Sequence, residues 1–329
     1  MGRRQPLPAG FEGTFSVGIA RLHGISRERL KGSDLDAPFH GVRTPRDTAH
    51  SDEGAVARAA DPFQRQREDR VARAALYAAR LHTGHFFSHQ TAASIWGAPL
   101  PLEFDEHGRV AGSDDLALHV SASGGVAFPR ARGIVGHRTL ASLTSIEVRD
   151  GLRVTSPDAT WAALGTLPLM DLIALGDYFC RRWRPGHGRP DPDRAPLTTI
   201  GALRASIEVG RRRGARRLRT ALESVREDSW SPRETHVRCV LVAAGLPEPQ
   251  LNIDVFASDG RFLACVDMAY PDRRVAVEYM GMLHGERWAQ DVERIAALRA
   301  AGWTVIEVTS PLLHKPGELA RRVAAALGR

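Results

Sequence analysis

Three short apolar segments follow one another near the C-terminal end of the chain, separated only by turn residues. Residues 251–256 alternate like a strand, Asp259-Gly260 is typical of a tight hairpin turn, and residues 262–270 form a second strand-like run. Pro271-Asp272 then turns the chain into residues 275–280. Strands joined by such short connections pair antiparallel, so this segment predicts a meander in which the register of every side chain is fixed.

Helical signals lie on both sides of the meander. Ser231-Pro232-Arg233-Glu234 places Ser at the N-cap, Pro at the first helical position and Glu two residues later, which is a capping box, and Gly245 ends this helix. A second helix is expected over residues 288–301, stopped at Gly302, and a last strand over residues 303–309. The predicted order is therefore one helix, three strands, one helix and one strand.

One hairpin of the meander brings two carboxylates together. If Pro271-Asp272 is a two-residue loop, Asp267 lies opposite Ala276, and Glu278 is its diagonal neighbour on the same face, with Cβ atoms roughly 7–8 Å apart. Any even-length loop keeps the two acids on one face. Burying such a pair costs free energy unless a cation or hydrogen bonds compensate it. The alternative is a solvent-facing surface where the acids are hydrated or paired with Arg273-Arg274.

Two carboxylates on one face can share a divalent cation. Mg²⁺ or Mn²⁺ takes oxygen ligands and retains bound water, which suits the hydrolysis of phosphodiesters. The pair formed by Asp267 and Glu278 therefore predicts a metal site of this kind.

The same residues resemble a known family. Asp267 to Pro271, Val275 to Gly281 with His284, Asp291 with Arg294, and Ala301 to Ile306 are similar to the endonuclease-like domain related to very-short-patch repair nucleases, within the PD-(D/E)XK superfamily. The resemblance covers about residues 228–312 and implies a restriction-endonuclease-like core (α-βββ-α-β). Upstream, residues 88–99 and 154–157 are similar to actinobacterial proteins that join this domain to an AbiE-type antitoxin-like winged helix.

The resemblance implies a role for each site residue. It makes Asp267 and Glu278 the metal ligands and Glu234 an accessory acid, although the capping box alone also explains Glu234, and both roles can coexist. His284 stands where the family pattern E-x-D-G-x-x-H places its histidine and could orient water or act as general base; a bystander in the loop is the alternative.

Met280 departs from the family pattern. It stands where relatives carry a second acid or a lysine, and Met282 likewise replaces a polar residue common in such loops. A thioether neither binds Mg²⁺ well nor stabilises an oxyanion, so a weakened or inactive nuclease is a serious alternative.

Basic residues indicate an anionic partner. The formal net charge is +7, which favours nucleic acid, and DNA is the expected ligand. On helical segments, basic side chains contact phosphates or simply face solvent, and Arg294 either reaches a phosphate or pairs with Asp291. The predicted DNA-contacting residues are Arg27, Arg29, Lys31, Arg211, Arg212, Arg213, Arg216, Arg217 and Arg294.

Linker-like segments at 44–70 and 184–196 divide the chain into blocks. Residues 1–43 predict a helix-turn-helix-like arm, with a second helix starting after Ser26 as its N-cap. Residues 71–183 predict a small mixed α/β, antitoxin-like module that starts with a helix over 71–81, and residues 197–329 predict the endonuclease-like domain. The expected class is mixed α/β, α+β overall.

Several classes of protein are excluded. No apolar stretch approaches the ~18 residues of a membrane helix, and no secretory signal is present, so we expect a cytoplasmic protein with no membrane partner. Three isolated cysteines fit neither a disulfide framework nor a zinc knuckle. His82, His85 and His89 are interrupted by Gly84, and we interpret them as scattered surface histidines.

Two functions remain open. The first is a DNA-associated, Mg²⁺- or Mn²⁺-dependent endonuclease. The second is a non-catalytic DNA-binding transcriptional regulator or antitoxin-type protein that uses an inactive nuclease fold, for which a toxin protein or a second copy of the chain would be possible partners.

Overall fold

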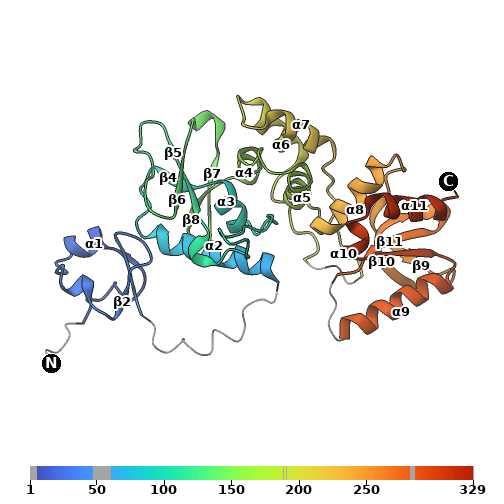
Figure 1. The fold of residues 1–329 in the computed structure, drawn as a ribbon, viewed down its shortest axis with the longest axis horizontal. Coiled ribbons are helices and arrows are strands. Elements are labelled where there is room, and N and C mark those ends of the chain that lie inside the picture. Colours follow the sequence, from blue (N-terminus) through green and yellow to red (C-terminus); the bar gives the residue numbers. More distant parts are fainter. Residues whose placement is uncertain (1–5, 47–60, 188, 190, 282–285, 329) are drawn as a thin grey trace. The chain divides into compact units, whose positions relative to one another are not determined.

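The computed structural model of the chain describes residues 6–46, 61–187, 189, 191–281 and 286–328, without the side chains of residues 286–289. It divides into a first unit, residues 1–164, and a second unit, residues 165–329, each of which is described by itself (Figure 1). Both units combine helices with sheets, which confirms the mixed α/β class. None of the helices described is long and apolar enough to cross a membrane.

The N-terminal part of the first unit is a small sheet rather than a helix-turn-helix arm. It contains β1 (Phe15–Ser16), α1 (Val17–Leu22), a 3-10 turn (Arg29–Lys31), β2 (Leu35–Asp36) and β3 (Val42–Pro45), with the strands in the order β1-β3-β2. The prediction of a second helix is wrong. The Arg29 guanidinium donates two hydrogen bonds, of 3.0 and 2.7 Å, to the Asp34 carboxylate. These two bonds hold the chain in a reversal directly after a single 3-10 turn.

The rest of the first unit is a five-stranded mixed sheet with helices, in the strand order β6-β5-β4-β8-β7. The elements are α2 (Pro62–Ala78), β4 (His85–Phe87), α3 (His89–Ile95), a 3-10 turn (Ser113–Asp115), β5 (Leu118–Ser123), β6 (Ile134–Thr139), a 3-10 turn (Ala141–Leu143), β7 (Ile146–Arg149), β8 (Leu152–Thr155) and α4 (Pro157–Ala163).

Helix α2 starts inside the predicted linker. Asp61 caps it by accepting from Phe63 N at 3.1 Å, so the expected start at residue 71 is wrong. The buried face of this helix is partly polar. Gln66 donates to Glu103 O and Ala111 O, and Arg70 is buried beside Ser94. Because polar side chains occupy positions that face the interior, the apolar period that marks a helix is missing from this part of the sequence.

The second unit begins with four helices: α5 (Leu169–Cys180), α6 (Ile200–Glu208), α7 (Ala215–Glu223) and α8 (Pro232–Ala243). Helix α5 falls in the predicted middle module, yet it groups with the second unit. A buried ion pair holds it there, since Arg238 Nη2 of α8 lies 2.9 Å from Asp177 Oδ2, and Thr235 donates to the same carboxylate. The boundary between the units therefore precedes the proline-rich segment 184–196.

A four-stranded sheet follows, in the order β12-β11-β10-β9, with β11 and β12 parallel and the other pairs antiparallel. One apolar cluster joins the sheet to α8 and α11, and the other joins it to α9. The order of one helix, three strands, one helix and one strand is the predicted one. The elements are β9 (Gln250–Phe256), β10 (Phe262–Tyr270), a 3-10 turn (Pro271–Arg273), β11 (Val275–Tyr279), α9 (Glu286–Ala300), β12 (Thr304–Val308), α10 (Ser310–Leu313) and α11 (Pro316–Ala326).

The hairpin between β10 and β11 has a four-residue connection, so the prediction of a two-residue loop is wrong. Pro271 opens a 3-10 turn, Arg274 adopts a left-handed conformation with φ 49°, and its N donates to Pro271 O at 3.0 Å. Tyr270 consequently pairs with Val275. Four residues are also an even number, so the side chains expected on one face remain on one face.

Candidate functional site

Asp267 and Glu278 lie on adjacent strands of the second unit and share a face of the sheet. The observed pairs Met268 with Val277 and Ala269 with Ala276, continued by one residue, set Asp267 opposite Glu278. The predicted diagonal relation is therefore replaced by a direct one, for which Cβ atoms are about 4.5–5.5 Å apart. At this point the Asp267 side chain accepts a hydrogen bond from Tyr279 N, with a distance of 2.8 Å to Oδ2.

Glu234 reaches the same region from the start of α8. Ser231 Oγ accepts from Glu234 N at 3.1 Å, which confirms Ser231 as the N-cap. The Glu234 carboxylate accepts from Trp230 N at 2.9 Å and from Asn252 Nδ2 at 3.0 Å. It thus satisfies the backbone before the cap while it lies close enough to Asp267 to raise the pKa of that carboxyl group. The cap contacts therefore leave the Glu234 carboxylate near Asp267.

Asn252 is a site residue that sequence reasoning missed. It is buried on β9 with φ 48°, a backbone conformation that residues other than glycine rarely adopt. Its neighbours Leu251 and Ile253 pair with β10 in a register that sets Asn252 opposite Asp267. The amide also donates to Asp228 O at 2.6 Å. Asn252 therefore orients Glu234, and no local sequence pattern predicts this contact.

The three acids, hereafter the acidic cluster (Glu234, Asp267 and Glu278), hold protons more tightly than ordinary carboxyl groups. Burial raises the pKa of Glu278 to about 7, although Arg294 lowers it in part. Burial, then repulsion from Glu278 and Glu234, raises the pKa of Asp267 well above its usual value. Burial also raises the pKa of Glu234, while the hydrogen bond from Asn252 lowers it. The site therefore favours any added positive charge.

Arg294 of α9 is a cation that contacts this cluster. Its Nη1 lies 2.9 Å from Glu278 Oε1, and its Nη2 lies 2.9 Å from Asp291 Oδ1. The ion pair expected with Asp291 is present, and the guanidinium also neutralises part of the charge on Glu278. The predicted phosphate contact by Arg294 would therefore have to compete with two carboxylates.

Met280 packs as an apolar side chain. It is partly buried and packs against the apolar cluster formed by β9, β10, β11, β12 and α9. Its thioether offers no oxygen ligand to a cation on this face. His284 and Met282 lie outside the described residues.

The predicted DNA-contacting residues lie in both units. In the second unit, Arg211, Arg213, Arg216 and Arg217 are exposed around the start of α7, and Arg217 Nη1 donates to Thr166 O at 2.9 Å. Arg212 Nε donates to Ser206 O at 2.9 Å. In the first unit, Arg27 is exposed, Lys31 lies 3.7 Å from Glu28, and Arg29 is committed to Asp34. Arg216 and Arg217 lie within helix α7 itself.

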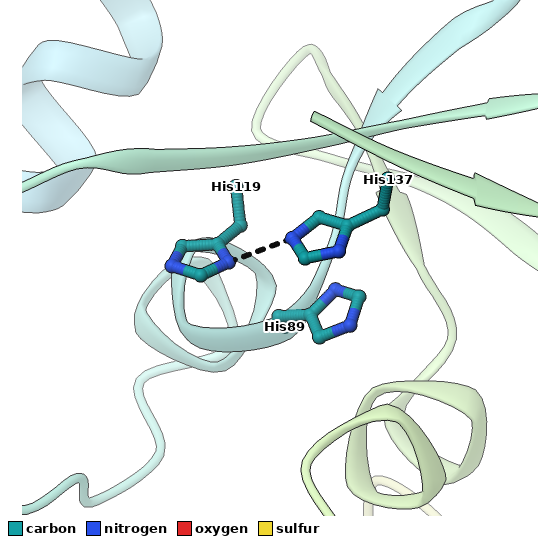
Figure 2. Close-up of side chains that lie close together, drawn as sticks. All are labelled: His89, His119 and His137. Carbon is teal, nitrogen blue, oxygen red and sulfur yellow. Dashed lines mark hydrogen bonds between the residues drawn. The ribbon is translucent and has the colours of Figure 1, made fainter. Parts of the chain in front are cut away.

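The histidines of the first unit do not all lie on the surface. His82 is exposed, but His85 is buried with its Nε2 2.7 Å from Ala127 O. His89 joins His119 and His137 in the histidine cluster shown in Figure 2. One nitrogen from each ring lies within 4.8 Å of the others, and within the described part of the chain no other set of three His, Cys, Asp or Glu side chains is this close.

Comparisons with known proteins give relatives of unknown activity. The chain is 33% identical over 144 residues to two proteins of Mycobacterium tuberculosis strains, named Uncharacterized protein MT2308 and Uncharacterized protein Rv2248, and the match covers 41% of this chain and 53% of each relative. The chain thus spans about half the length of the curated relatives it matches. No family model matches, and no solved structure matches.

Proposed function

We propose that the second unit is a Mg²⁺- or Mn²⁺-dependent hydrolase of DNA phosphodiesters, with Asp267 and Glu278 as metal ligands and Glu234 as an accessory acid. The observation that carries this proposal is the gathering of the acidic cluster from α8, β10 and β11. Two of its members are almost inaccessible, Glu234 at 7% and Glu278 at 2% exposure. Buried carboxylates that repel one another are unusual unless they serve a function.

The donor set fits a hard cation. Carboxylate oxygens are the ligands that Mg²⁺ and Mn²⁺ prefer, and such a cation would remove the repulsion that raises the pKa of Asp267. When bound, the cation activates water and stabilises charge on the phosphorus. The resemblance to PD-(D/E)XK nucleases and the order of one helix, three strands, one helix and one strand support the same assignment.

The chain's own residues orient the carboxylates. Tyr279 N holds one oxygen of Asp267, and Asn252 with Trp230 N holds Glu234. Arg294 positions Glu278. If Glu278 held the cation, the guanidinium of Arg294 would be placed to donate hydrogen bonds to a phosphate oxygen. His284 stays a candidate for the general base.

Exposed arginines in the same unit supply a surface for DNA. Arg211, Arg213 and Arg216 are exposed around the start of α7. Arginines placed this way neutralise backbone phosphates without reading sequence, and each contact makes binding more sensitive to salt. They support DNA as the polymer to be cleaved.

A second candidate is a non-catalytic DNA-binding regulator. Two observations favour it: Met280 gives the cation no ligand, and Arg294 already lies against Glu278 in the place of a counter-charge. In this case the nuclease-like fold would serve as a binding platform, and no metal would be needed.

A plasmid-nicking assay separates the two candidates. Wild type, Asp267→Asn and the control Asp272→Asn are incubated with supercoiled plasmid and either Mg²⁺, Mn²⁺ or EDTA. Asp272 is an exposed acid in the β10–β11 turn and touches none of the acidic cluster. We expect metal-dependent nicking by wild type and the control but not by Asp267→Asn. Absence of nicking together with salt-sensitive DNA binding would contradict the hydrolase and favour the regulator.

A further inference from the structure

The histidine cluster of the first unit is assembled by non-local strand pairing. Strands β5 and β6 are parallel, with His119 beside Val135 and Ser121 beside His137. His119 and His137 therefore lie on the same face of two neighbouring strands. Strand β4 pairs with β5 on its other side, and the chain leaves β4 through Ser88 directly into His89, the first residue of α3. Three segments that lie far apart in the sequence thus contribute one imidazole each.

The rings are close enough to share a ligand. His119 Nδ1 lies 2.9 Å from His137 Nε2, as the dashed line in Figure 2 shows. The His89 and His137 ring centroids are 3.7 Å apart and the rings are nearly parallel, at 18°. Two nitrogens at hydrogen-bond distance must share one proton if both rings are neutral. A metal ion could take the place of that proton.

The cluster is held in the form that binds metals. Burial, then the neighbouring His137 and His119, lowers the pKa of His89 to about 3. Burial, His137 and Arg70 lower the pKa of His119 to about 4. Neutral imidazole is the ligand form of histidine, so these two rings need not lose a proton before they bind at neutral pH.

Hydroxyl groups anchor two of the three histidines. Ser88 Oγ lies 2.9 Å from His89 Nδ1 and accepts from Ser121 Oγ at 2.7 Å. A hydrogen bond of this kind to a ring nitrogen is typical of metal-binding histidines. Thr91 Oγ1 accepts from the backbone N of His119 at 2.8 Å, which ties β5 to α3.

Among the residues described, Arg70 is a buried cation near the histidine cluster, and other side chains compensate its charge. Arg70 Nη2 lies 2.8 Å from Glu103 Oε1, and its Nη1 donates to Ser94 Oγ at 3.0 Å. Glu103 therefore offsets part of the charge that Arg70 places near the cluster.

We propose that His89, His119 and His137 form a binding site for Zn²⁺. Three imidazole ligands and no carboxylate select a borderline cation over Mg²⁺. With Zn–N bonds of about 2.0–2.1 Å, tetrahedral ligand nitrogens lie about 3.3 Å apart, so nitrogens now within 4.8 Å of one another can reach these positions by side-chain rotation. All three side chains are partly exposed, which leaves the fourth position to water or to an exogenous ligand.

Isothermal titration of the full chain with ZnCl₂ tests the site, with MgCl₂ as the comparison ion. We expect one Zn²⁺ at the histidine cluster, in addition to any cation held by the acidic cluster, and no comparable Mg²⁺ binding to the histidine cluster. His119→Gln and His137→Gln should each weaken Zn²⁺ binding at least about 100-fold, since loss of a ligand exceeds the 10–100-fold effect of losing an outer partner. His107→Gln, at an exposed histidine outside the cluster, should bind like wild type.

Two outcomes would overturn the proposal: no stoichiometric Zn²⁺ binding by wild type, or equal binding by wild type and both cluster variants. If a variant fails to fold, diethyl pyrocarbonate modification of wild type, with and without Zn²⁺, tests the site instead. Zn²⁺ should protect His119 and His137 from modification but leave His107 reactive, and unprotected cluster histidines would contradict the site. None of these readouts depends on the acidic cluster, so the two proposals can fail separately.

Discussion

Glu278→Gln should stabilise the metal-free protein at alkaline pH. Glu278 is 2% exposed, and burial raises its pKa to about 7 against an ordinary value of 4.5. At about 1.36 kcal/mol per pH unit, this difference corresponds to about 3 kcal/mol of lost stability once the carboxylate is ionised. Replacing the carboxyl group by an amide removes that cost, and it also removes a repulsion from Asp267.

The direction of this pH dependence follows from proton linkage. Because the folded protein binds the Glu278 proton more tightly than the unfolded chain, its contribution to stability is complete below pH 4.5 and is lost as the pH rises through about 7. The variant and wild type should therefore have similar free energies of unfolding at pH 4.5. The variant should become more stable between pH 4.5 and 7, by up to about 3 kcal/mol at pH 8.

Urea unfolding in EDTA, read by pulsed hydrogen exchange of peptides within residues 262–279, assigns the transition to the second unit. Glu307→Gln is the matched control, because Glu307 pairs with Glu278 in the β11–β12 register but is exposed and bound to Arg299. This control should not reproduce the gain of about 3 kcal/mol expected for Glu278→Gln at pH 8. A Glu278→Gln difference that does not change with pH, or that grows toward acid pH, would refute the argument.

Four further substitutions test other parts of the structure. Ser231→Ala removes the hydrogen bond that Glu234 N donates to the cap and should lower the free energy of unfolding by about 1 kcal/mol, measured by urea unfolding. Arg238→Leu leaves Asp177 buried without its partner and should cost about 3–5 kcal/mol in the same assay, whereas a loss below 1 kcal/mol would show that the ion pair is unimportant. Arg211→Ala and Arg216→Ala should each reduce the slope of log DNA affinity against log salt by about 1, and an unchanged slope would remove these arginines from the interface.

The meander and its acids were predictable because their signals are local. Strand alternation and turn residues define β9, β10 and β11, and the parity of the loop places Asp267 and Glu278 on one face whatever even length it has. The length itself was not predictable. Pro271 fits a two-residue turn as well as the 3-10 turn that forms, and the choice depends on Arg274, whose carbonyl accepts from Thr304 N of the distant strand β12.

Contacts between distant segments could not be predicted from the sequence. The second helix of the N-terminal arm fails because Asp34 folds back onto Arg29, and the start of α2 is hidden because Gln66 and Arg70 occupy its buried face. The histidine cluster depends on the parallel pairing of β5 with β6, which no spacing along the chain reveals. The sequence drew attention to His82, His85 and His89, but only the last belongs to the cluster.

We propose that the acidic cluster holds a hard divalent cation. Electron paramagnetic resonance of Mn²⁺ titrated into wild type and Asp267→Asn gives the number of bound ions, and Mg²⁺ competition separates an oxygen site from imidazole ligands. We expect one Mn²⁺ per wild-type chain that Mg²⁺ displaces and that Asp267→Asn does not bind. Equal Mn²⁺ binding by the two proteins, or no Mg²⁺-displaceable Mn²⁺ in wild type, would contradict it.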